Sequence, residues 1–164
     1  GMPARSYAVS PAELDEDGNP VDTPSYNAYG DYILYRPDAG EDTPIYGLPV
    51  DYTVDAFPQA YYIDPANAEI ARFTADGVRV WLTYSPRNSQ AVSEASTPEA
   101  IAALDAYFRA NLNAAILTPL QDSLLPGRYF YGTDNHLSTN GVALRTAQVI
   151  TALKDALQKE GLTP

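Results

Sequence analysis

From Asp64 to the C-terminus the sequence alternates helical and strand patterns, and this alternation constrains the fold more than any other feature. Asp64-Pro65 predicts an N-cap followed by a proline at the first helical position, opening a helix that ends before Gly77. Residues 78–84 (VRVWLTY) are apolar and β-branched, which predicts a buried strand that ends at Ser85-Pro86.

The same alternation continues to the C-terminus. Thr97-Pro98-Glu99 begins the next helix, and residues 115–118 predict a second short strand that ends at Pro119. The aromatic run 129–131 after Gly127 is bounded like a strand or the end of one. Ser138 then caps a long helix with an apolar face formed by Val142, Val149, Ile150, Leu153 and Leu157.

This order of elements predicts an α/β fold, a three-layer α/β/α sandwich with parallel strands. With 164 residues, the chain is expected to form one domain. Residues 1–63 are expected to be its loop-rich part, rich in Tyr and Pro, and residues 64–164 its α/β part. Within the first part, residues 15–20 predict an acidic turn and residues 26–35 a turn leading into a short strand.

Composition excludes several classes of partner and chemistry. A formal net charge of −11 opposes binding to nucleic acid or to anionic membranes. No stretch approaches the length of a membrane span, and the N-terminus lacks the basic region followed by an apolar block that is typical of an export signal, so none is expected in this chain. Without cysteine and with a single histidine, the chain cannot build a His/Cys metal site, so neither a metal nor a cofactor is expected. The compartment stays open.

The chemistry of the chain centres on that single histidine, His136, which follows Asp134 by two residues. Ligands gather at the carboxyl ends of parallel strands, so the loop at residues 85–88 and the loop at 132–136 are expected to lie together there. An acid beside a histidine is the arrangement that fixes an imidazole tautomer for general-base catalysis. The alternative is that His136 only makes local hydrogen bonds.

Residues 129–153 (YFYGTDNHLSTNGVALRTAQVITAL) resemble the last conserved block of SGNH/GDSL-type hydrolases, most strongly that of bacterial cell-envelope members. Residues 79–88 (RVWLTYSPRN) are similar to the late core strand of that family, and residues 26–36 to an insertion before it. The resemblance implies a flavodoxin-like sheet and a serine esterase or acetylhydrolase acting on acyl or acetyl esters, often of carbohydrate. It implies that His136 is the general base, oriented by Asp134.

The sequence departs from that family at three points. The acid lies one residue closer to the histidine than in the usual pattern, which would place it at Thr133. The Gly-Asp-Ser block that supplies the nucleophile is absent, because Tyr32 follows Gly30-Asp31. No Gly-x-Asn-Asp block offers oxyanion donors, for which Asn88 is a substitute by position alone. Without a serine and an oxyanion hole, a triad loses orders of magnitude in rate.

No serine in the chain has the sequence context of a nucleophile. Ser85 is the best placed of them, at the end of a predicted strand, and together with Asn88 and Thr133 it is a candidate to line the site. The other candidates, each more typical of a cap or a turn, are Ser6, Ser10, Ser89 and Ser123. A pair of carboxylates for glycoside hydrolysis is a further alternative, but nothing in the sequence selects the two acids.

Three hypotheses therefore remain for the protein. It is an SGNH-like hydrolase that is truncated or inactive, a glycan- or envelope-binding domain without chemistry, or a structural interaction protein. Gly1 before Met2 is typical of tag cleavage, so Met2 is expected to begin the intended sequence. Together with the missing nucleophile block, this start suggests the C-terminal part of a longer hydrolase, whose full-length form is expected to be extracytoplasmic. A domain that lacks strands would expose sheet surface, and forming homo-oligomers is one way to cover it.

Overall fold

The chain divides into two units, residues 1–35 and residues 36–164. The computed structural model describes Arg36, Ile45 and residues 47–162. The expected turn at residues 15–20 and the expected strand at 26–35 lie outside the described residues.

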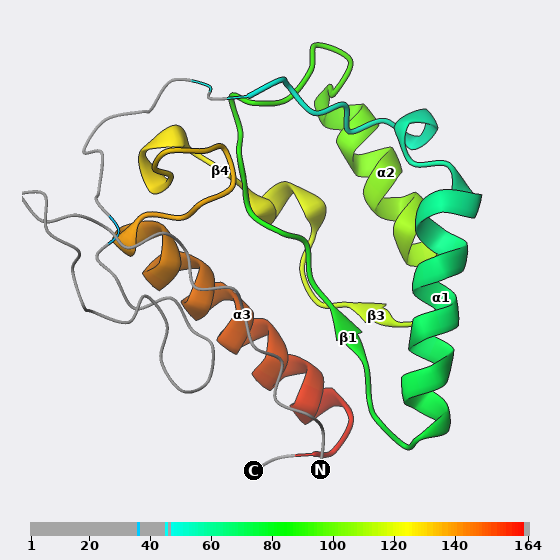
Figure 1. Ribbon diagram of the computed structural model, residues 1–164. Helices are drawn as coiled ribbons and strands as arrows, with labels where there is room; N and C mark the ends of the chain where they lie inside the picture. Colours follow the sequence, from blue (N-terminus) through cyan, green and yellow to red (C-terminus); the bar gives the residue numbers. More distant parts are fainter. Residues whose placement is uncertain (1–35, 37–44, 46, 163–164) are drawn as a thin grey trace, which may run out of the picture. The chain divides into compact units, whose positions relative to one another are not determined.

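Helices alternate with short parallel strands, which makes this unit an α/β structure (Figure 1). In the view of Figure 1, helices α1 (Gln59–Ala75) and α2 (Pro98–Asn111) lie on one side of the strands, and helix α3 (Thr139–Lys159) lies on the other. A short 3-10 helix, η1 (Val54–Ala56), precedes α1.

Helix α1 begins six residues before the position that its sequence predicts. Its N-cap is Pro58, and Pro65 lies inside the helix, so the prediction of an N-cap at Asp64 was wrong. Proline at an interior position cannot donate to the carbonyl four residues earlier, which here belongs to Tyr61. The predicted end of the helix is confirmed, since Asp76 is the C-cap and Gly77 adopts a positive φ of 76°.

The strands are shorter than expected and form two parallel pairs. Strand β1 (Trp81–Leu82) pairs with β3 (Ala115–Ile116), and β2 (Arg87–Asn88) pairs with β4 (Leu124–Leu125). The prediction of a buried strand over residues 78–84 was therefore wrong in length and in burial, because β1 is half-buried. Strand β2 lies where a loop was expected, and no strand was predicted at β4.

Both pairs join the same two stretches of chain, residues 81–88 and residues 115–125. Between the two ladders, the second stretch makes an extra 3-10 turn, η2 (Leu120–Ser123). The buried hydroxyl of Ser123 donates to Leu120 O within this turn, at 2.6 Å. Because this turn lies between β3 and β4, the same stretch of chain pairs first with β1 and then with β2. Strand β2 ends at Asn88, one of the candidate site residues.

Helix α2 begins where the sequence predicts. The side chain of Thr97 accepts a hydrogen bond from Ala100 N, and Pro98 follows it at the first helical position. On its buried face, Ile101 and Leu104 pack with Leu120 and with Leu124 in the main apolar cluster. Partly buried aromatic side chains surround that cluster: Tyr52, Phe57, Tyr84, Tyr107 and Phe108.

A polar network fixes α2 against the strands. Asp105 accepts hydrogen bonds from the Tyr84 hydroxyl at 2.7 Å and from Arg109 Nε at 2.8 Å. Burial alone would raise the pKa of Asp105, but these bonds and the charge of Arg109 hold it below its usual range. Burial, with the hydrogen bond to Asp105 and its charge, raises the pKa of Tyr84.

The aromatic run before α3 does not form a strand, and its first residue, Tyr129, ends a 3-10 turn. Helix η3 spans Gly127–Tyr129, and Phe130 makes a single antiparallel bridge to Leu137. The predicted cap of α3 is confirmed, because the buried Ser138 accepts from Gly141 N at 3.2 Å. A Cβ at Gly141 would lie 2.3 Å from Tyr129 O, so this helix entry requires glycine.

Candidate functional site

Two loops predicted to meet do lie together. Asn88, at the end of β2, is fully buried, and its backbone N–H donates to Asp134 O at 2.8 Å. Its side-chain Nδ2 reaches Asp134 Oδ1 at 3.5 Å, while its Oδ1 accepts from Gln90 N. The backbone of the loop at residues 132–136 is thus fixed to the end of the strand pair. The Asn88 amide is engaged in this junction and does not form an open oxyanion site.

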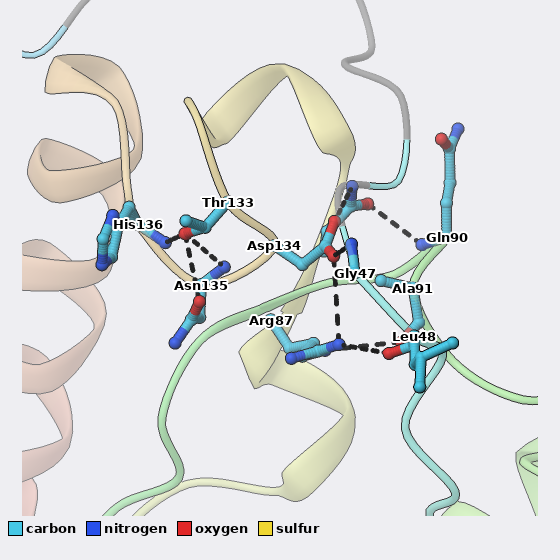
Figure 2. Close-up of polar contacts among 10 residues, drawn as sticks. Gly47, Leu48, Arg87, Gln90, Ala91, Thr133, Asp134, Asn135 and His136 are labelled. Carbon is cyan, nitrogen blue, oxygen red and sulfur yellow. Dashed lines mark hydrogen bonds and ion pairs between the residues drawn. The ribbon is translucent and has the colours of Figure 1, made fainter.

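The Asp134 carboxylate joins three segments of the chain. It is 3% exposed, and Oδ2 accepts a hydrogen bond from Gly47 N at 2.8 Å. The same oxygen lies 4.0 Å from Arg87, whose guanidinium also donates to Leu48 O at 3.1 Å. Figure 2 shows the carboxylate directed toward Gly47 and Arg87. This carboxylate links the segment at residue 47 to the loop that contains His136.

His136 lies on the other side of this loop. Its imidazole points away from the Asp134 carboxylate (Figure 2), and no hydrogen bond joins the two groups in the described part of the chain. The side chain is exposed, and its ring centroid is 6.0 Å from that of Tyr131. The pairing of Asp134 with His136 that the resemblance implies is therefore not made in this conformation.

Thr133, the other position at which the triad acid was expected, organises the turn. Its hydroxyl oxygen accepts from the backbone N–H of His136 at 3.0 Å and lies 3.1 Å from Asn135 Oδ1, to which it donates. The turn closes through Tyr131 N, which donates to His136 O at 3.0 Å. These bonds fix the backbone of His136 and leave its imidazole open to solvent.

Ser85 lies apart from the histidine. It is exposed, and it borders an apolar hollow of about 410 Å³ on the α2 side of β1, with Phe57, Tyr84 and Phe108. Among the described residues, no hydrogen bond connects Ser85 with His136. The structure therefore brings Asn88, Asp134 and Thr133 together around one loop, but it does not bring a serine to His136.

A larger groove lies between β3 and α3. Its volume is about 640 Å³, within the usual size range of ligand pockets. Trp81 contributes an indole whose Nε1 donates to Glu160 at 3.3 Å and which Arg79 covers at 5.6 Å from the ring centroid. The α3 side of the groove carries Gln148, Thr151 and Asp155.

Sequence reasoning missed this groove and the part played by Gly47. A signal for the groove was present, because Gln148, Thr151 and Asp155 recur at three- and four-residue spacing and so share one helix face. Trp81 is the single tryptophan of the chain. No comparable signal marks Gly47, whose N–H reaches Asp134 across 87 positions of sequence.

Arg145 connects α3 with the end of β1. Its guanidinium donates to Thr83 Oγ1 and to Tyr84 O, each at 2.6 Å, and the side chain is buried. Burial lowers the pKa of Arg145, and the charge of Asp122 partly offsets this effect. Arg145, the arginine of the Arg-Thr pair that carries part of the family resemblance, thus anchors the helix to the strand.

Comparison with protein families, with curated proteins and with solved structures found no match to this chain. Within the described residues, no helix is long and apolar enough to cross a membrane.

Proposed function

We propose that the protein is an SGNH-hydrolase-like domain, a three-layer α/β/α sandwich related to serine esterases that act on acyl or acetyl esters of carbohydrate or cell-envelope material. The observation that carries this proposal is the junction of Asn88 with Asp134, which holds the histidine loop at the carboxyl end of a parallel strand pair. The block at residues 129–153 supplies the family signature.

From the same geometry we expect this chain to be an inefficient catalyst. The carboxylate that should orient the imidazole is held by Gly47 and lies beside Arg87, and the best-placed serine borders a separate hollow. A histidine without a serine and without oxyanion donors lacks the parts that supply most of the rate in such enzymes.

Hydrolysis of a short-chain aryl acetate tests this function. We expect the wild-type protein and His136→Ala to hydrolyse it at rates that agree within about twofold, because no nucleophile is activated. Turnover that depends on His136 and saturates with substrate would show that the chain is an active esterase.

The groove between β3 and α3 favours a second candidate, a carbohydrate-binding domain without chemistry. An indole that is fixed by Glu160 and Arg79 offers a flat apolar surface, while Gln148 and Asp155 offer a donor and acceptors beside it. The exposed Tyr61 and Tyr62 lie on α1 and do not border this groove.

Fluorescence of Trp81, the single tryptophan, reports directly on this candidate. Titration with chitotetraose or cellotetraose is expected to shift its emission, and Gln148→Ala is expected to weaken the response about tenfold. Gln158→Ala is the matched control, since Gln158 is on the same helix, is exposed and does not border the groove. An unchanged spectrum at millimolar sugar, or equal effects of both variants, would contradict binding in the groove.

A further inference from the structure

The two edges of the β1–β3 pair differ in a way that points to a missing neighbour. Parallel strands are found inside larger sheets with both faces covered, and a two-stranded sheet by itself is only marginally stable. Here Trp81 faces Ala115, and Leu82 faces Ile116. The backbone N–H and C=O groups along each edge show which edge can accept a further strand.

The outer edge of β3 is closed by a side chain. Leu117 N donates to Leu82 O at 2.8 Å, so Ile116 and Thr118, one residue to either side, direct their backbone groups away from β1. The Arg109 guanidinium donates to both outward carbonyls, at 2.8 Å each. Asp105 fixes that guanidinium. A strand edge capped in this way is protected against pairing.

The outer edge of β1 carries no such cap. Because Leu82 O faces β3, the backbone groups of Trp81 and Thr83 are directed to the opposite edge. In the described part of the chain, β3 is the strand paired with β1, and no hydrogen bond is made by the backbone of Thr83. Arg79 and Thr83 are exposed, and no proline interrupts the segment 79–83.

We propose that this edge, residues 79–83, pairs with the same edge of a second copy of the chain, antiparallel about a twofold axis at Trp81. The dimer joins the two strand pairs into one sheet in the order β3, β1, β1 and β3. Both Arg109-capped edges then lie outermost, which closes the assembly. This inference rests on the strand geometry and is independent of the proposed hydrolase relationship.

The side chains of the segment suit this self-pairing. In the twofold register Trp81 lies opposite Trp81 of the second copy, and Arg79 lies opposite Thr83, so no like charges face each other. The overall charge of −11 on each copy opposes association. The dimer is therefore expected to strengthen as salt is added, because salt screens the repulsion between whole molecules.

Sedimentation and cross-linking together test the proposal. The wild-type protein is examined by analytical ultracentrifugation from about 1 μM to about 1 mM, a range that spans the affinities of moderate and weak dimers. The chain has no cysteine, so Trp81→Cys introduces a unique thiol. In the proposed register, the two copies of this residue are about 5.5 Å apart at Cα, within disulfide range.

Thr83→Cys is the matched control. Its two copies are displaced by four residues along the strands, about 13 Å, which is beyond disulfide reach. We expect a dimer that strengthens with salt, and oxidation to a covalent dimer about tenfold faster for Trp81→Cys than for Thr83→Cys. Thermal melts establish that both variants fold.

A wild-type protein that remains monomeric up to about 1 mM would overturn the proposal, whatever the variants do. Equal cross-linking of folded Trp81→Cys and Thr83→Cys would overturn it as well, since the contact between copies would then lie elsewhere.

Discussion

At the scale of single residues, Asp134 and His136 are close in sequence but differ in environment. Asp134 is buried and accepts a hydrogen bond from Gly47, whereas His136 is exposed. Their spacing predicted a catalytic pair, and the meeting of their loop with Asn88 was predicted correctly. The direction of the Asp134 carboxylate could not be predicted, because its partner Gly47 is distant in sequence and carries no side chain.

Replacing Asp134 by Ala is expected to lower the free energy of unfolding by about 1–3 kcal/mol, since Gly47 N–H loses its acceptor and Arg87 its counter-charge. His136→Ala, in the same loop, is the control and is expected to change it by less than about 0.5 kcal/mol. Urea titrations measure both. Equal losses for the two variants would indicate that Asp134 does not anchor the loop.

Gly141 is the second residue with a specific requirement. We expect Gly141→Ala to cost about 2–4 kcal/mol, because the new Cβ meets the carbonyl oxygen of Tyr129 and neither backbone segment moves freely. At Gly47 a Cβ would lie 3.4 Å from Asp134 Oδ2, an ordinary contact, so Gly47→Ala is the control with a small effect. A stable Gly141→Ala protein with an unchanged melting temperature would be inconsistent with the described helix entry.

At the scale of elements, local capping signals predicted helix boundaries well where the capping residue makes its bond. Thr97 and Ser138 both do so. Asp64 does not cap a helix, and its side chain accepts from Gln59 inside α1. The helix already begins at Gln59, before Pro65, and burial of Ile63 stabilises these first turns. A proline signal read by itself does not include this contribution from packing.

Pro65→Ala therefore tests where α1 begins. An interior proline destabilises a helix by about 3 kcal/mol. Replacing it also gives the unfolded chain more conformational entropy, which lowers the unfolding free energy by up to about 1 kcal/mol. We therefore expect the unfolding free energy to rise by about 2 kcal/mol in total. Pro58→Ala, at the N-cap, should bring no such gain. A loss of stability on Pro65→Ala would instead favour a helix that starts at Pro65, where proline is preferred.

The network between α2 and the strands predicts a dependence on alkaline pH. The folded pKa of Tyr84 is raised, so its contribution to stability is complete below about pH 10, the pKa of a tyrosine in the unfolded chain, and is lost as the pH rises above that value. Tyr84→Phe is expected to reduce the loss of stability between about pH 9 and 11, measured by urea unfolding. Tyr61→Phe, at an 80% exposed residue, should leave the pH profile unchanged.

The strands were the elements that sequence predicted least well. The pattern of residues 78–84 is that of an interior parallel strand, yet the ladder of β1 contains Trp81 and Leu82 alone. A strand forms only where a neighbour is present, and sequence periodicity does not report on neighbours. Strands β2 and β4 were missed for the same reason, because their pairing depends on the η2 turn.

At the scale of the whole molecule, the alternation of helices and parallel strands was predicted, and the α/β class is confirmed. The sandwich and the hydrolase relationship remain proposals that rest on residues 129–153 and on the meeting of two loops. Within this proposal, His136 belongs to an esterase-type site with no serine beside it.

Labelling with a fluorophosphonate, followed by peptide mass spectrometry, is the decisive experiment for this site, because the reagent reacts with serines that a neighbouring base activates. We expect no adduct on any serine of the chain, in the wild type or in His136→Ala. A stoichiometric adduct on Ser85, or on any other serine, that disappears in His136→Ala would contradict this expectation.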